Sequence, residues 1–141
     1  MATATAFEVK PNAPMKAVNV EVDNDGSITY AELQNATNAR LVDVVSLETS
    51  VGALDFWLDE EGMFAPAPEV NTQVMWLMHS VGAQLHQFYV GDCLVTTADD
   101  MGRTLPLNDE QIRFLENLAQ QFDKPTFEHN VLMPMMLQRQ L

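Results

Sequence analysis

The residues from Glu21 to Glu32 combine the carboxylates and the glycine that a calcium-binding EF-hand loop requires. Such a loop supplies oxygen ligands at its first, third, fifth and twelfth residues and turns sharply at a glycine in sixth position. Asp23, Asp25 and Glu32 fall on ligand positions in this register, and Gly26 falls on the glycine position. The first position, however, is Glu21 rather than Asp, and a strand-like segment precedes it where an EF-hand has a helix. We therefore expect a hairpin turn here, with calcium binding by Asp23, Asp25 and Glu32 as an alternative function.

Acidic side chains also form short groups at the ends of other predicted elements. Such carboxylates can serve a metal-dependent hydrolase, can keep a protein soluble or, when gathered on one face, can imitate the phosphates of a nucleic acid. Turns that lie far apart in the sequence must come together to form such a face. We predict a partner-binding acidic surface made of Glu21, Asp23, Asp25, Asp59, Glu60, Glu61, Asp99, Asp100, Asp109 and Glu110.

Histidine and cysteine residues give weaker signals of chemistry. His79 and His86 lie seven residues apart, whereas metal-binding histidine pairs on a helix lie about three or four apart. His129 is distant from both in the sequence. Cys93 lies in an apolar run, as a small buried hydrophobic residue does, and no neighbouring base marks it as a nucleophile. We therefore predict a non-enzymatic protein with no catalytic residue, no metal and no cofactor, and keep the hydrolase as a second alternative.

The charge balance narrows the range of partners. The chain has 141 residues, with 7 Lys and Arg against 20 Asp and Glu, so its net charge is −13. Phosphate contacts and anionic membrane surfaces both require basic side chains, so we predict no direct nucleic-acid binding and no membrane binding. A single cysteine excludes an intramolecular disulfide framework. Because the first residues lack the basic and apolar regions of a secretory signal, we expect a cytoplasmic protein.

Length and composition predict one folded domain with two extensions. A chain of 141 residues that is 47% hydrophobic can bury a core without disulfides or metals. We expect a flexible extension over 1–14, a single domain over 15–125 and a Met-rich C-terminal arm over 126–141. Because methionine adapts to many surfaces, we predict that this arm docks on its own domain or on a second copy, which makes a homo-oligomer possible. The residues predicted to make these contacts are Leu132, Met133, Met135, Met136 and Leu137.

The periodicity of apolar residues predicts an α+β fold. Alternating or apolar runs predict strands at 16–22, 40–47, 54–59 and about 88–95. Helical spacing predicts two main helices, at about 71–81 and 109–122, the second starting with a capping box at Asn108 and Gln111. We expect these helices to pack on a small, mostly antiparallel sheet.

The order of several short motifs resembles an uncharacterised domain family of small bacterial, plasmid and bacteriophage proteins. The resemblance covers about residues 15–115 and implies origin in a mobile element, where small acidic proteins often inhibit host enzymes or defence systems. The motifs that carry it are Met15-Lys16-Ala17-Val18, Leu33-Gln34, Asp59-Glu60-Glu61-Gly62, Asn71, Gly91-Asp92-Cys93-Leu94-Val95-Thr96 and Asp99-Asp100 followed by Gly102.

Charge and resemblance together lead to one main hypothesis. The chain is predicted to be an acidic protein of phage or mobile-element origin that binds and inhibits a host protein through its acidic surface. The sharpest form is mimicry of DNA at a nucleic-acid-binding site, as in antirestriction and anti-CRISPR proteins.

Overall fold

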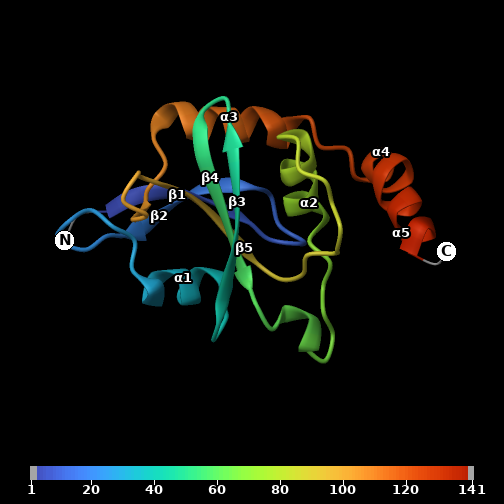
Figure 1. Ribbon diagram of the computed structural model, residues 1–141, viewed down its shortest axis with the longest axis horizontal. Helices are drawn as coiled ribbons and strands as arrows, with labels where there is room; N and C mark the ends of the chain where they lie inside the picture. Colours follow the sequence, from blue (N-terminus) through green and yellow to red (C-terminus); the bar gives the residue numbers. More distant parts are fainter. Residues whose placement is uncertain (1–2, 140–141) are drawn as a thin grey trace.

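The computed structural model describes residues 3–139 and confirms the predicted α+β fold. All paired strands are antiparallel, and five of them form one continuous sheet in the order β2-β1-β5-β4-β3 (Figure 1). The short β6 pairs with β5. The strands are β1 (Thr3–Val9), β2 (Lys16–Glu21), β3 (Val42–Thr49), β4 (Gly52–Asp59), β5 (Cys93–Ala98) and β6 (Thr104–Leu105).

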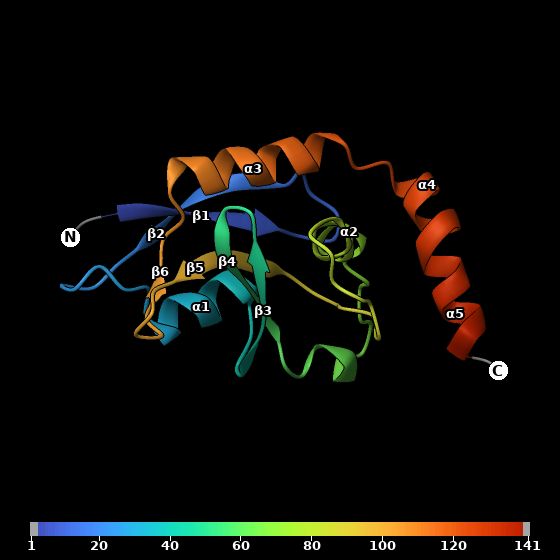
Figure 2. The same ribbon diagram turned by 45° about the horizontal axis from the view of Figure 1, so that its top comes forward.

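Helices cover both faces of this sheet. Figure 2 shows α3 on one side of β5 and α1 on the other, with α2 beside the strands and the C-terminal helix at the edge of the molecule. None of the helices in the described residues is long and apolar enough to span a membrane. The helical segments are α1 (Tyr30–Thr37), η1 (Gly62–Phe64), α2 (Thr72–Ser80), α3 (Asp109–Gln120), α4 (Lys124–Phe127), the π-helical turn η2 (Glu128–Leu132) and α5 (Met133–Arg139).

The N-terminal strand β1 corrects the expectation of a flexible extension over 1–14. Residues Thr3–Val9 lie inside the sheet, paired with β2 on one side and with β5 on the other. Ala6, Phe7 and Val9 are fully buried. The prediction failed because β1 is buried by pairing with β2 and with β5, and β5 lies far away in the sequence. The small residues of β1 themselves give only a weak strand signal. Residues 1–2 of the predicted extension lie outside the described residues.

The predicted strands at 40–47 and 88–95 also differ from those observed. The first occurs as β3 (Val42–Thr49), but it is an edge strand with alternating exposed residues rather than a buried one. The second begins only at Cys93, because Val90 pairs with Val70 in an isolated bridge and Gly91 turns the chain with a φ of +81°.

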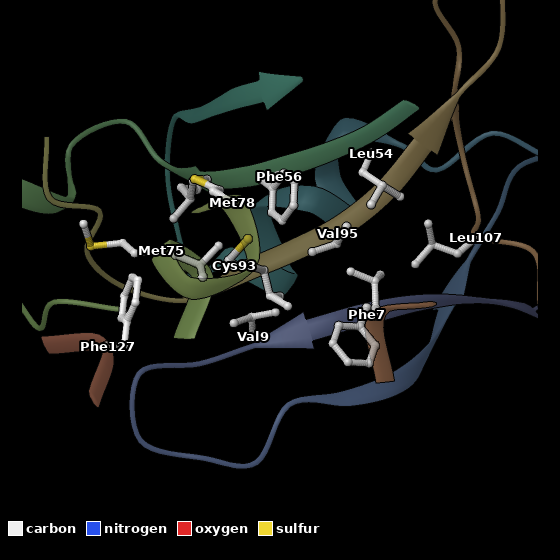
Figure 3. Packing of buried hydrophobic residues seen from close by; sticks show 14 of the residues in the cluster. Phe7, Val9, Leu54, Phe56, Met75, Met78, Cys93, Val95, Leu107 and Phe127 are labelled. Carbon is white, nitrogen blue, oxygen red and sulfur yellow. The ribbon is translucent and has the colours of Figure 1, made fainter. Parts of the chain in front are cut away.

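The two predicted main helices occur as α2 and α3 and form the larger part of the core with one sheet face. Figure 3 shows Phe56 and Cys93 from the sheet and Met75 from α2 pointing into this core. On the other face, α1 places Leu33 against Ala6 and Leu94 in a smaller cluster. Alternate residues of each central strand therefore serve two separate cores, as the two-residue period of a strand requires.

Candidate functional site

The turn at residues 23–27 holds two carboxylates in place with backbone hydrogen bonds. Asp23 Oδ1 accepts from the backbone N–H of Asp25 and of Ser27, each at 3.1 Å. Asp25 Oδ1 accepts from Ser27 N–H at 2.9 Å. Gly26 has a φ of +84°, a backbone conformation in which glycine is favoured. The hairpin turn predicted within residues 21–32 is thus confirmed, and backbone N–H groups of the same turn hold its carboxylates in place.

A second acidic turn, at residues 99–103, is built in a similar way. Asp99 Oδ1 accepts from the N–H of Met101 at 3.0 Å and of Arg103 at 2.9 Å. The other oxygen, Oδ2, accepts from Arg103 Nε at 2.7 Å. Asp100 lies exposed at the tip beside Met101, whose surface is 84% accessible.

Arg103 and one backbone hydrogen bond bring the two turns together. Ile28 N–H donates to the carbonyl of Thr104 at 2.9 Å, so the two turns lie side by side. Arg103 Nη1 lies 3.8 Å from Asp25 Oδ2 while its Nε binds Asp99. We name the group Glu21, Asp23, Asp25, Asp99 and Asp100 the acidic end.

The hydrogen bonds within the acidic end favour the ionised carboxylates. Hydrogen bonding to Asp23 and to Ser27, with a smaller attraction from Arg103, lowers the pKa of Asp25 to about 2. Hydrogen bonds from the backbone and side chain of Arg103 lower the pKa of Asp99. In turn, Asp99 raises the pKa of the Arg103 guanidinium. Asp25 and Asp99 are therefore negatively charged throughout the physiological pH range.

The other predicted acidic residues lie elsewhere on the fold. Asp55 of β4 pairs with Thr96 of β5, and the two strands are antiparallel. Asp59 comes four residues after Asp55 and Asp99 three residues after Thr96, so the two lie in opposite directions from this pair. At the usual rise of a strand, this places Asp59, Glu60 and Glu61 roughly 20 Å from Asp99. Glu61 is bound there by Arg40 Nη2 at 2.7 Å. The structure therefore divides the predicted acidic surface rather than gathering all of it.

Asp109 and Glu110 have a structural explanation of their own. They lie in the first turn of α3, where negative side chains stabilise the positive end of the helix dipole. The helix begins with the predicted capping box, in which Asn108 and Gln111 exchange side-chain and backbone hydrogen bonds of 3.0 and 2.8 Å. Gln111 also donates to Val51 O at 3.0 Å, which ties this turn to the β3–β4 hairpin.

The predicted calcium ligands are not arranged around a common point. Glu32 Oε2 accepts from the backbone N–H of Glu21 at 2.7 Å, while Asp23 and Asp25 accept from the N–H groups of their own turn. Within the part of the chain that the structure describes, there is no group of three or more His, Cys, Asp or Glu side chains placed to hold a metal ion.

Cys93 and the histidines have different surroundings. Cys93 is fully buried as predicted, and burial raises the pKa of its thiol, so the reactive thiolate is disfavoured. His79 packs against Phe127 with a ring-centroid distance of 5.8 Å. His79 and His86 both line a groove of about 450 Å³ between the end of α2 and the C-terminal helix.

The C-terminal arm packs on its own domain, but only some of the residues predicted to make contacts are buried there. Phe127 and Leu132, five residues apart, are both buried. The turn between them is π-helical, with Met133 N–H donating to the carbonyl of Glu128, and its i, i+5 hydrogen bonding brings residues five apart to the same side. Met135 is partly buried against the main core. Met133, Met136 and Leu137 instead remain exposed to solvent.

Sequence reasoning missed two features of the surface. Arg103 is the basic residue that organises the acidic end, and its position four residues after Asp99 was the available signal. The loop from Met63 to Val70 consists entirely of exposed residues, and Phe64 is 85% accessible. Pro66 and Pro68 mark this loop in the sequence.

A family model described as "Domain of unknown function (DUF3846)" matches residues 5–123. The chain belongs to this family. The DUF3846 match includes most of β1 and all of the acidic end, and it stops immediately before α4. It therefore starts earlier than the region of about 15–115 over which the motifs suggested a resemblance. Comparison of the DUF3846 chain with curated proteins and with solved structures finds no match.

Proposed function

We propose that this DUF3846 protein is a non-enzymatic inhibitor of phage or mobile-element origin that binds a basic, nucleic-acid-binding surface of a host protein through its acidic end. The observation that carries the proposal is the joining of two acidic turns, 23–27 and 99–103, by the Ile28–Thr104 hydrogen bond and by Arg103. The chain thereby places two acidic turns beside a single guanidinium, that of Arg103, at one end of the sheet.

The acidic end has the physical properties of a phosphate mimic. Backbone N–H groups hold Asp23, Asp25 and Asp99 in fixed positions, so little conformational entropy is lost when a partner binds them. The lowered pKa values of Asp25 and Asp99 keep both carboxylates charged, as phosphates are. Arrays of Lys and Arg that bind nucleic acid attract such a surface and accelerate association with it. The exposed Met101 at the tip adds an apolar contact that a purely ionic interaction lacks.

Paired charge variants test this proposal. The variant D23N/D25N/D99N/D100N removes four charges from the acidic end, and Asn keeps the side-chain oxygen that accepts the turn hydrogen bonds. The control D59N/E60Q/D109N/E110Q removes four charges elsewhere, so both variants have the same net charge. Each immobilised protein is exposed to a bacterial lysate, and the bound proteins are eluted with duplex DNA and identified by mass spectrometry.

The expected result is that the wild-type and control proteins retain nucleic-acid-binding proteins that DNA elutes. The acidic-end variant should retain them at least about tenfold less well, since opposite charges at close contact are lost. Equal loss in both variants would show that net charge alone attracts these proteins. If the wild-type protein retains no nucleic-acid-binding protein in low salt, the proposed function is wrong.

A further inference from the structure

The exposed apolar residues of the C-terminal helix differ from those elsewhere in the described chain. Outside this helix, the large exposed apolar side chains lie within three residues of an acidic residue in the sequence: Tyr30, Leu41, Val44, Met63, Phe64, Val70 and Met101. Met133, Met136 and Leu137 have no acidic neighbour at that range. The residues from 129 to 138 in fact include no Asp or Glu at all.

The geometry of the helix turns these three side chains to the same side. Met133, Met136 and Leu137 follow the i, i+3, i+4 spacing that places side chains on one helical face. The opposite face carries Val131 and Met135, which pack against the main core, so the exposed face has a fixed orientation. The accessible fractions of Met133, Met136 and Leu137 are 51%, 47% and 60%, which leaves about half of this apolar stripe in contact with water.

We propose that the occupant of this stripe is the same stripe on a second copy of the chain. Two copies that each have a net charge of −13 repel one another wherever their acidic surfaces meet. The segment from 129 to 138 contributes no carboxylate to such a contact, and Glu128, one turn before Met133, is paired with Lys124. A basic partner, by contrast, would find no complementary charge there.

The position of the helix keeps the acidic end away from this contact. Figures 1 and 2 both place α5 at one side of the molecule and β2, which leads into the acidic end, at the opposite side. At physiological ionic strength, charges are screened over about 8 Å, so acidic ends on the far sides of a dimer repel only weakly. Pairing of the helices about a two-fold axis also leaves both acidic ends free for a partner.

The pairing is weak, because three partly exposed side chains on each copy form a small contact. Stable complexes bury roughly 1,200–2,000 Å² in total, and one short helix face against another falls below this range. We expect a dissociation constant on the order of 100 µM. Salt should strengthen the dimer, since it screens the repulsion between the two acidic copies and leaves apolar contact intact. Binding to a basic partner has the opposite salt dependence.

Sedimentation equilibrium of the full chain over about 10–500 µM, in low and high salt, tests the proposal. The mass should rise from the 15.8 kDa of one copy toward twice that value, and more so in high salt. The variant M133Q/M136Q/L137Q should raise the dissociation constant about tenfold or more, with an unchanged circular dichroism spectrum, because Gln supports a helix nearly as well as Met. The control M63Q/F64Q/M101Q replaces three exposed apolar side chains elsewhere and should dimerise as the wild-type chain does.

Other outcomes contradict the proposal. A mass of one copy at every concentration and salt would exclude the dimer. Equal association of the wild-type chain and the helix variant would place the contact elsewhere, and equal loss in both variants would show association without a specific surface.

Discussion

Asn71 joins three segments of the chain from within the core. Its side-chain amide donates to the carbonyls of Val9 and Gly91, each at 2.8 Å, and its oxygen accepts from Val74 N–H at 3.0 Å. The residue is completely buried. All hydrogen-bonding groups of this side chain are therefore used, and they connect the end of β1 and the segment before β5 to the start of α2.

The substitution Asn71→Asp should destabilise the protein by about 3 kcal/mol or more. An ionised carboxylate cannot donate to either carbonyl and would itself be buried beside them. Urea unfolding followed by tryptophan fluorescence measures this loss. Asn130→Asp makes the same chemical change at an exposed position of the C-terminal helix and should change stability by less than about 0.5 kcal/mol. Similar effects at both positions would contradict the role assigned to Asn71.

Asp92 is a residue whose charge should oppose folding. Partial burial raises the pKa of its carboxyl, Glu8 and Glu69 raise it further, and Lys10 opposes them. Since the folded pKa lies above the unfolded value, the ionised form costs stability at neutral pH, and this cost disappears as the pH falls below about 4.

We therefore expect Asp92→Asn to raise the thermal unfolding midpoint at pH 7 and to leave it unchanged near pH 3. Thermal scans monitored by circular dichroism at both pH values provide the measurement. Asp100→Asn, in an exposed turn, serves as the control for removal of one charge. A lower midpoint for the Asp92 variant at pH 7 would show that its attraction to Lys10 outweighs the burial.

At the scale of the elements, β1 shows where sequence patterns lose information. α2 and α3 can be predicted from the sequence because the signals that define them lie within each segment. Apolar residues follow helical spacing, and Asn71 caps α2 while Asn108 caps α3. β1 contains mostly small residues, and its position between β2 and β5 follows from pairing across the sheet. Sequence patterns reflect interactions between residues that are close in the sequence. They therefore predict the two helices and miss this central strand.

The acidic end likewise depends on a contact between distant segments. Each acidic turn has a local signal in the sequence, since each contains a glycine with a positive φ, Gly26 at +84° and Gly102 at +81°. Their contact depends on the Ile28–Thr104 hydrogen bond between segments that lie far apart in the sequence, and nothing within either turn predicts it. For the same reason the separation of Asp59, Glu60 and Glu61 from this group was visible only in the fold.

The central position of β1 predicts a large effect of truncating Phe7. This side chain is fully buried in the main core, so Phe7→Ala should reduce the free energy of unfolding by about 3–5 kcal/mol. Val44→Ala, on the exposed face of the edge strand β3, should cost less than about 1 kcal/mol. Urea titration of both variants measures the difference, and a loss below 1 kcal/mol for Phe7→Ala would mean that β1 is not part of the stable sheet.

At the scale of the whole molecule, the net charge of −13 affects both stability and association. Six ion pairs within 4 Å are present among the described side chains, all with substantial exposure, so they offset little of the repulsion between carboxylates. Repulsion between like charges favours the expanded unfolded chain, and salt screens it.

Raising sodium chloride from about 20 to 300 mM at pH 7 should therefore raise the thermal unfolding midpoint by a few degrees. The acidic-end variant D23N/D25N/D99N/D100N should show a smaller rise, because four of the repelling charges are absent. A midpoint that falls with added salt would show that the ion pairs, rather than the excess of carboxylates, dominate the electrostatic energy of the fold.

The acidic end defines the molecule's proposed role, and displacement of DNA tests that role most directly. A nucleic-acid-binding protein captured by the wild-type chain is first bound to fluorescent duplex DNA, and fluorescence anisotropy is followed as the acidic protein is added. The wild-type chain and the control D59N/E60Q/D109N/E110Q should release the DNA, whereas D23N/D25N/D99N/D100N should require at least about tenfold more protein. If the wild-type chain binds this partner while the DNA stays bound, the acidic end does not occupy the nucleic-acid site.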